Sequence, residues 1–423
     1  MKGKKISFVM AVLCLLVVSL FTGCITTAQE QSSIKLKEQP ILPGPNISYE
    51  EKDPGILLFR KLAEDTNGNL VFSPLSISIA MMMAYEGAEG ETKKEIQEVF
   101  NIENEEELRE YYKSLMAVLN RENKTYESSI ANSVWAEQSL NLVQEFKELI
   151  KEHYDGELNS VNFIELPEEA RQEINAWIEE KTNGLIKEML GQGTIRPDTA
   201  LVIVNAIYFK GSWEKKFNKI DTIKREFTKE TGERVIADMM HITDGFYYAE
   251  TDDLQILEMY YEGREISMVI LLPKDSNLER LEKGLTTEKL KDWRNALSYK
   301  EAEVFFPKFK FGIPVLELKG YLREMGIKAA FSDYARFSMV ENEDKTEIPL
   351  KIDKVLHKAL IEVNEEGTEA AAATVIQLEI CESNLEPEPV IPVFNADHPF
   401  VFIIQEKNSG NILFMGKVVN PNE

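Results

Sequence analysis

One stretch near the carboxyl end alternates regularly enough to predict a strand with one apolar face. Between Thr368 and Cys381 every second residue is small or apolar, and all the charged and amide residues belong to the other set. The first set is Thr368, Ala370, Ala372, Thr374, Ile376, Leu378 and Ile380. Successive side chains of a strand point to opposite faces, so this set would line a core while the other faces water. The segment can therefore become a central strand of a sheet.

The alternative for residues 370–373 is a helix, because alanine is the best helix former. The residues that follow favour the strand. Thr374-Val375-Ile376 is β-branched, and prolines farther on exclude a long helix. These prolines are Pro387, Pro389 and Pro392. We therefore expect an exposed loop over about 365–393, with a first half small enough to enter between neighbouring strands.

The amino terminus has the pattern of a secretion signal. Three lysines within the first five residues precede an apolar run, 6–21, which is too short and too early for a transmembrane span. Leu-Phe-Thr-Gly-Cys at 20–24 is similar to a lipoprotein-processing box. We predict a signal peptide over 1–23 and a lipid on Cys24, with ordinary secretion and cleavage nearby as the alternative.

Residues 24–54 predict a tether, because they are polar, contain prolines and show no periodicity. No second linker interrupts the rest, so we expect one domain over 55–423. Export would place it outside the cell or at its surface. Sequons at Asn46 and Asn123 predict glycosylation where the host performs it.

Charge and cysteine content exclude several functions. The chain has 72 acidic and 48 basic residues, a net charge of −24, which argues against nucleic acid and anionic membrane partners. Membrane contact is expected only through Cys24. Cys14 lies in the signal, so only Cys381 remains as a free thiol and no disulfide framework is expected. Without ligand-spaced histidines, a phosphate loop or a nucleophile elbow, we expect no metal, cofactor or catalytic residue.

Helical and strand-like segments predict an α+β fold with large antiparallel sheets. Ser73 and Pro74 fit the cap and first turn of a buried helix, which we prefer to a hydrolase triad built on Ser73 and His357. An apolar strand over 201–209 contains Asn205, and a buried amide needs a hydrogen-bond partner.

The sequence also predicts the secondary structure of three further segments. We expect a short strand over 247–249 within a largely strand-like region. A longer strand is expected over 302–309, and a helix over 316–325.

Several stretches together are similar to the serpin family. They are Asn69-Leu-Val-Phe-Ser-Pro-Leu-Ser, Leu201-Val-Ile-Val-Asn-Ala-Ile-Tyr-Phe-Lys-Gly-Ser-Trp-Glu, Asp397-His-Pro-Phe, Leu413-Phe-Met-Gly and the alternating segment beginning at Glu365. The resemblance covers about 55–421. It implies three β-sheets, eight or nine helices and an exposed reactive-centre loop.

The resemblance also implies a suicide inhibitor rather than an enzyme. A protease cleaves the loop and forms an acyl-enzyme, and the freed loop then inserts into the main sheet and carries the protease along. The native sheet lacks a strand, so the inserted form is the more stable one. The expected protein is a monomer whose partner is a target protease of the serine type, with a cysteine protease as the alternative.

Family motifs assign site residues by resemblance. The hinge would be Glu365, Glu366, Gly367, Thr368, Glu369, Ala370, Ala371, Ala372 and Ala373; the shutter, Ser73, Ser76, Asn205 and His357; the breach, Trp213, Thr222 and Lys308. Glu365 is expected to pair with Lys308, and His357 to hydrogen-bond Asn205. Family spacing places the scissile bond at Cys381–Glu382.

Two other functions are compatible with parts of the sequence. A non-inhibitory member of the family would carry a ligand or assist folding, and bulky or charged inward hinge residues would favour it. A lipid-anchored solute-binding protein would explain Cys24 and the tether but not the alternating segment.

Overall fold

The computed structural model describes residues 53–423 except 121–124, 313, 342–349, 369–390 and 408. All of them belong to one unit of the chain, Ile41–Glu423. The predicted signal, almost all of the tether, the lipidation site Cys24 and the sequons at Asn46 and Asn123 lie outside the described residues. The first described helix begins at Pro54, one residue before the predicted start of the domain.

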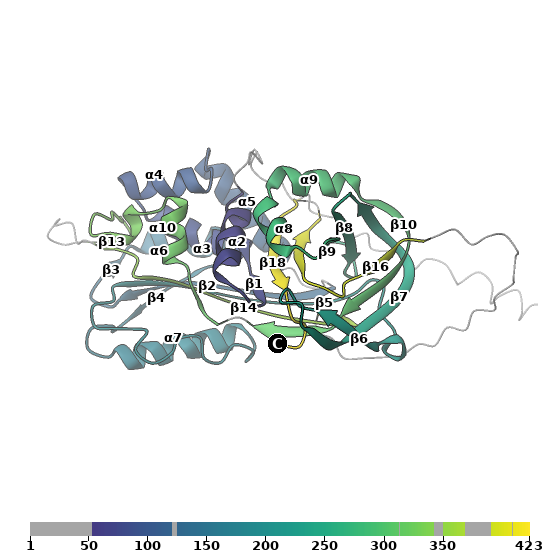
Figure 1. Ribbon diagram of the computed structural model, residues 1–423. Helices are drawn as coiled ribbons and strands as arrows, with labels where there is room; N and C mark the ends of the chain where they lie inside the picture. Colours follow the sequence, from purple (N-terminus) through teal and green to yellow (C-terminus); the bar gives the residue numbers. More distant parts are fainter. Residues whose placement is uncertain (1–52, 121–124, 313, 342–349, 369–390, 408) are drawn as a thin grey trace, which may run out of the picture. The chain divides into compact units, whose positions relative to one another are not determined.

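A seven-stranded sheet runs through the middle of the described fold (Figure 1). Its path is β11 (Phe309–Gly312), β14 (Lys354–Asn364), β15 (Gly367–Thr368), β5 (Leu201–Ser212), β2 (Tyr126–Glu137) and β4 (Glu157–Val161), and β12 (Leu316–Glu317) also pairs with β14. Strands β14 and β5 are parallel neighbours over residues 354–359 and 202–207, and farther along β15 separates them.

A nine-stranded sheet forms the second large layer. Its path is β1 (Leu70–Phe72), β18 (Ile412–Val418), β17 (Phe400–Glu406), β9 (Ile266–Pro273), β8 (Leu254–Tyr260), β7 (Arg234–Glu250), β10 (Ser298–Pro307) and β16 (Val393–Asn395), with β6 (Ile223–Thr228) beside β7. A two-stranded sheet of β13 (Val340–Glu341) and β3 (Asn141–Leu142) completes the described sheets.

Nine α-helices are described, within the predicted eight or nine. They are α2 (Pro54–Asp65), α3 (Pro74–Glu86), α4 (Gly90–Val99), α5 (Glu105–Leu119), α6 (Gln144–Tyr154), α7 (Pro167–Lys181), α8 (Leu278–Gly284), α9 (Thr287–Ala296) and α10 (Lys319–Met325). The α+β prediction is thereby confirmed.

Helix α3 is buried on nearly all sides because it packs against both large sheets. It contacts β5 and β2 of the seven-stranded sheet and β18 of the nine-stranded one. Helix α7 covers the opposite face of the seven-stranded sheet (Figure 1). The two faces of β5 therefore enter different apolar clusters, with Ile203 and Ile207 in one and Val202 and Val204 in the other. Burial on both faces explains why β5 is apolar almost throughout.

Three predicted elements differ from the structure. The helix expected over 316–325 begins only at Lys319, because Leu316–Glu317 pairs with β14 as β12. The strand expected over 247–249 is the end of the long β7, whose polar first half is stabilised by pairing with β6 and β10. The strand expected over 302–309 is two strands, β10 and β11, which belong to different sheets. Lys308 lies between them, where the chain passes from one sheet to the other.

Candidate functional site

Three polar side chains form a row across the seven-stranded sheet beneath α3. Asn205 of β5 lies in register with Asn132 of β2 on one side and with His357 of β14 on the other. All three are at most 2% exposed. The Asn205 amide donates to Asn132 Oδ1 and to the backbone oxygen and hydroxyl of Ser76, the latter at the start of α3. The row therefore joins three strands to one helix.

The hydrogen bonds of His357 determine its tautomer. The Ser73 backbone N–H donates to His357 Nε2 at 3.1 Å, so Nε2 is an acceptor. Nδ1 therefore carries the proton and donates to Asn205 Oδ1. Because the site is fully buried, the charged imidazolium is disfavoured, and the pKa of His357 falls from 6.5 to about 3. Ser73 is also the N-cap of α3, where its hydroxyl accepts from Ser76 N–H at 3.1 Å. The helix-cap role expected for Ser73 is thus present.

The first hinge residues already occupy the sheet. Gly367 and Thr368 form β15 between β14 and β5, antiparallel to both. Thr368 is 1% exposed, and its hydroxyl shares a 2.8 Å hydrogen bond with that of Tyr261. The Tyr261 ring stacks on Trp213, with ring centres 4.5 Å apart. The Thr368 side chain therefore points into the core, on the face that the alternating pattern predicts.

Two consecutive carboxylates hold the chain just before β15. Glu365 is 3% exposed; it pairs with Lys308 at 3.0 Å and accepts from Thr222 Oγ1 at 2.8 Å. Burial opposes its ionisation, but hydrogen bonds from its own backbone, Lys308 and Thr222 outweigh burial and hold the pKa of the carboxyl below its usual value. Glu366 lies 3.4 Å from Lys219. The expected Glu365–Lys308 pair is therefore present.

Backbone hydrogen bonds fix the same segment. Trp213 N–H donates to the Glu366 carbonyl at 2.7 Å, and Phe217 N–H to the Glu365 carbonyl at 3.0 Å. The Trp213 indole donates to the Asn364 carbonyl at 3.0 Å. The breach residues expected from the sequence thus meet the hinge, as Trp213 contacts it through both its backbone and its ring.

Gly367 permits this close packing. Its φ is +150°, and a Cβ there would overlap the Gly211 carbonyl oxygen. We expect Gly367→Ala to expel β15 from the sheet, so that the Trp213 and Phe217 amides exchange with solvent at least roughly tenfold faster. Hydrogen exchange with mass spectrometry measures this.

A matched control for that variant is Gly232→Ala. Gly232 also has a positive φ, +80°, but no atom lies within 4 Å of its added Cβ, so it tests backbone strain alone. Unchanged exchange of both amides in a folded Gly367→Ala protein would show that β15 tolerates a side chain there.

Several predicted residues lie outside the described residues. They are Glu369, Ala370, Ala371, Ala372 and Ala373 of the hinge and Cys381 and Glu382 of the predicted scissile bond. The strands described on either side of residues 369–390 belong to different sheets. Thr368 ends β15 in the seven-stranded sheet, and Val393 begins β16 in the nine-stranded sheet.

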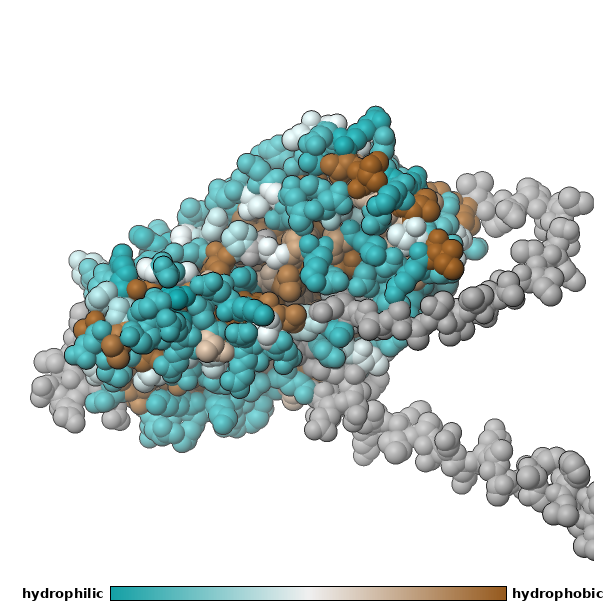
Figure 2. All heavy atoms as spheres, turned by 90° about the horizontal axis from the view of Figure 1, so that it is seen from below, coloured by the Kyte–Doolittle hydropathy of each residue, from teal (hydrophilic) through white to brown (hydrophobic). Residues whose placement is uncertain are grey.

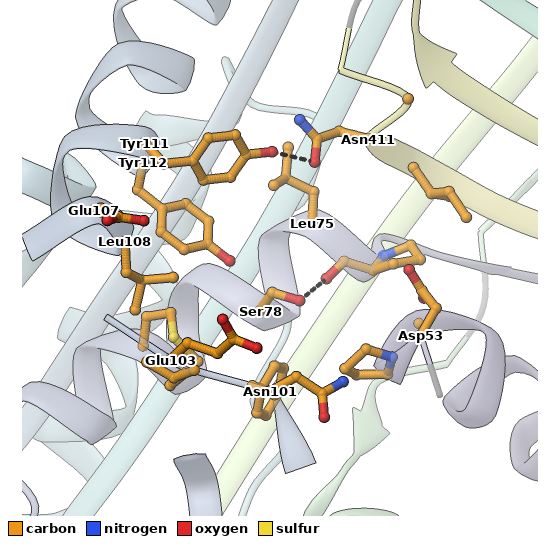
Figure 3. Close-up of a pocket in the computed structure, with 18 of the residues that line it drawn as sticks. Asp53, Leu75, Ser78, Asn101, Glu103, Glu107, Leu108, Tyr111, Tyr112 and Asn411 are labelled. Carbon is orange, nitrogen blue, oxygen red and sulfur yellow. Dashed lines mark hydrogen bonds between the residues drawn. The ribbon is translucent and has the colours of Figure 1, made fainter. Parts of the chain in front are cut away.

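A pocket of about 130 Å³ lies between the start of α2, α3 and α5 (Figure 3). Asp53, Glu103 and Glu107 line it together with apolar side chains, and the Tyr111 hydroxyl donates to Asn411 beside it. Small-molecule sites usually have about 300–1,000 Å³, so this pocket is smaller than a typical one. None of the predicted hinge, shutter or breach residues lines it.

Neither a membrane helix nor a metal site appears in the described part of the chain. No described helix is long and apolar enough to cross a bilayer. The described residues also contain no group of three or more histidine, cysteine or carboxylate side chains placed to hold a metal ion.

Comparison with known proteins gives one consistent family. The family described as Serpin (serine protease inhibitor) matches residues 50–421. An uncharacterized serpin-like protein of Methanosarcina mazei is 36% identical over 413 residues, 95% of each chain. The leukocyte elastase inhibitor of Equus caballus is 37% identical over 378 residues, which are 86% of this chain and 96% of that protein.

Solved structures agree with this match. Human thyroxine-binding globulin, in complex with thyroxine, has a TM-score of 0.78 at 30% identity and covers 88% of this chain and 97% of its own. Uncleaved ovalbumin has a TM-score of 0.77 at 31% identity, covering 88% and 98%. The match spans nearly all of the described fold, including the hinge, shutter and breach residues described above, and this chain belongs to the serpin family.

Proposed function

We propose that the protein is an inhibitor that traps a protease as a covalent acyl complex by inserting its cleaved loop into the seven-stranded sheet. The observation that carries this proposal is β15, a two-residue strand already placed between β14 and β5 with Thr368 facing the core. The loop begins in the position that a full insertion would extend.

The register of β15 supports a full insertion. Thr368 lies opposite Gly211 of β5 and Val363 of β14. Continued in that register, the strand would set Thr374 beside both Asn205 and His357. Residues directly opposite in antiparallel strands share a face, so the Thr374 hydroxyl would meet the polar row. The inserting strand would break the buried hydrogen bond between Asn205 and His357, and it would bring a polar group to the same place.

The length of the sheet agrees with the predicted scissile bond. In the same register Leu378 would lie opposite Leu201, the first residue of β5. Cys381 would follow three residues beyond the end of that strand. A protease acylated there would be carried to the opposite end of the sheet from the breach. We therefore retain Cys381–Glu382 as the proposed bond.

The inward hinge residues favour inhibition over ligand carriage. The inward side chains are small and uncharged, so their burial costs little free energy. They belong to Thr368, Ala370, Ala372 and Thr374. Thyroxine-binding globulin, one of the similar structures, binds a ligand. The 130 Å³ pocket beside α3 is smaller than a typical small-molecule site. The name of the leukocyte elastase inhibitor accords with the inhibitory proposal.

The proposed target is a serine protease with a small or apolar specificity pocket, with a papain-like protease as the alternative. A bond one residue later would direct the loop to a glutamate-specific protease. Export and a lipid on Cys24 would place the inhibitor at the cell surface, facing secreted proteases.

The test mixes the purified protein with subtilisin-like, elastase-like and glutamate-specific proteases and analyses the products on a denaturing gel with mass spectrometry. We expect a covalent band at the summed mass and a released peptide that begins at Glu382. The loop-cleaved protein should melt well above the intact one, since insertion adds a strand to the sheet. Cleavage without a covalent band and without a rise in melting temperature would refute the proposal.

A further inference from the structure

Two buried hydroxyl groups, those of Tyr261 and Thr368, are hydrogen-bond partners at β15. Their oxygens are 2.8 Å apart, and the two residues are 0% and 1% exposed. Because both side chains are buried, bulk water cannot take the place of either partner. A buried hydroxyl without a partner is costly, so each of these groups depends on the other.

The position of Tyr261 is set by contacts outside the hinge. Its ring stacks on Trp213 and meets Phe209 edge-on, with ring centres 4.5 and 5.0 Å apart. Phe209 lies in β5, and Trp213 directly follows that strand. The backbone adds a β-bridge between Tyr261 and Trp213, and the Glu262 N–H donates to the Ser212 carbonyl at 2.8 Å. These contacts hold the Tyr261 hydroxyl at the end of β5, ready to meet the hinge.

Full insertion would keep the hydrogen bond between Tyr261 and Thr368. Thr368 lies opposite Gly211 of β5 and Val363 of β14. An inserting strand that extends β15 in this register adds residues after Thr368 and leaves Thr368 where it is. The bond can therefore hold β15 in the sheet of the resting protein without opposing insertion.

We propose that Tyr261 is a positioning residue for protease trapping, because its hydroxyl holds Thr368 in the sheet before any cleavage. This inference rests on the proposed inhibitory function. Without the bond, β15 would leave the sheet, and insertion after cleavage would have to bury an unpaired hydroxyl. Insertion would then be slower, and hydrolysis of the acyl-enzyme would compete with it more often. While Tyr261 is present, the first inward hinge position thus requires a hydroxyl in addition to small size.

A double-mutant cycle tests this pair. Tyr261→Phe and Thr368→Val each keep nearly the shape of the side chain and leave one buried hydroxyl without its partner, whereas the double variant leaves none. The Trp213 and Phe217 amides donate to hinge carbonyls, so their hydrogen exchange reports whether β15 is in place. We expect exchange of both amides to be at least roughly tenfold faster in either single variant and to return near the parent rate in the double variant.

The same variants are then mixed with a protease that the parent protein traps. We expect the ratio of trapped to cleaved protein to fall at least roughly threefold in either single variant and to recover in the double variant, with the rate of loop cleavage unchanged. The control is Tyr154→Phe, which removes another buried tyrosine hydroxyl, one that donates from α6 to Glu86 at 2.7 Å. It should leave the exchange of both amides and the trapping ratio unchanged.

Several results would overturn the inference. Unchanged exchange in a folded Tyr261→Phe protein would show that the bond does not hold β15, and additive effects in the double variant would show that the two hydroxyls do not act on each other. Faster exchange with an unchanged trapping ratio would remove the role in trapping. Faster loop cleavage in the single variants would mean that the bond restrains the loop instead.

Failure of the proposed function has a different result. A parent protein that traps no protease would refute that function, and this role of Tyr261 with it. The exchange measurement needs no protease, so it would still show whether the bond holds β15 in the sheet.

Discussion

In the proposed mechanism, Thr368→Arg will convert the protein from an inhibitor of its target protease into a substrate. Thr368 is 1% exposed, and its hydroxyl meets Tyr261 inside the core. An arginine there would bury a charge without a partner, which costs several kcal/mol, so β15 should leave the sheet in the native variant and insertion would have to bury that charge. Insertion will then be slower than hydrolysis of the acyl-enzyme, and the ratio of trapped to cleaved protein should fall roughly a hundredfold or more. A denaturing gel of the protease reaction measures that ratio directly.

Two variants make this result interpretable. Thr231→Arg places the same side chain at an exposed threonine of the turn between β6 and β7 and should inhibit like the parent. Thr368→Ser keeps the hydroxyl that reaches Tyr261 and should retain most of the trapping. If Thr368→Arg trapped the protease as well as the parent protein, insertion through β15 would not be the mechanism.

Acid will destabilise the native protein through His357. Burial lowers its pKa to about 3, whereas in the unfolded chain it is about 6.5. Above pH 6.5 the imidazole is neutral in both states, so it has no effect on the pH dependence. Below pH 6.5 the unfolded state gains a proton that the folded state refuses, and stability falls by about 1.4 kcal/mol per pH unit toward pH 3. Protonation in the folded state would also break the hydrogen bond from Ser73.

Urea unfolding at pH 7.5 and pH 4.5 tests this dependence. His357→Gln should be less stable than the parent at pH 7.5, and the difference between the two should shrink by about 2–3 kcal/mol at pH 4.5. Lys291→Gln, at an exposed lysine of α9, is the control and should follow the parent at both pH values. A parent–His357→Gln difference that is equal at the two pH values would contradict the assigned neutral state.

Residue reasoning alone anticipated the features that local physics dictates. A single amide within an apolar strand required a partner, and Asn205 has partners on both sides. Serine followed by proline predicted the cap of α3. Alternation predicted the inward face of Thr368. The family resemblance, rather than the residues themselves, supplied the pairing of Glu365 with Lys308.

Other site residues escaped prediction because tertiary register selects them. Asn132 lies in β2, and only the alignment of β2 with β5 brings it beside Asn205 in the polar row. Tyr261 follows β8 and forms an isolated β-bridge with Trp213, and its hydroxyl contacts Thr368. The sequence pattern alone does not predict this bridge. Lys219 is one of many surface lysines until the fold sets it beside Glu366. The lipid at Cys24 and the bond at Cys381–Glu382 stay predictions.

The parallel ladder between β14 and β5 has a consequence for how long the protein remains active. Residues 354–359 pair directly with 202–207, and the inserted strand can pass only after these pairs separate. In the proposed mechanism the form with an inserted loop is more stable than the intact protein. Separation of this ladder is then part of the activation barrier between the two forms. Its working lifetime is then a rate that rises steeply with temperature, rather than an equilibrium free energy. At constant temperature the protein would then lose its inhibitory activity with time, even without any protease present.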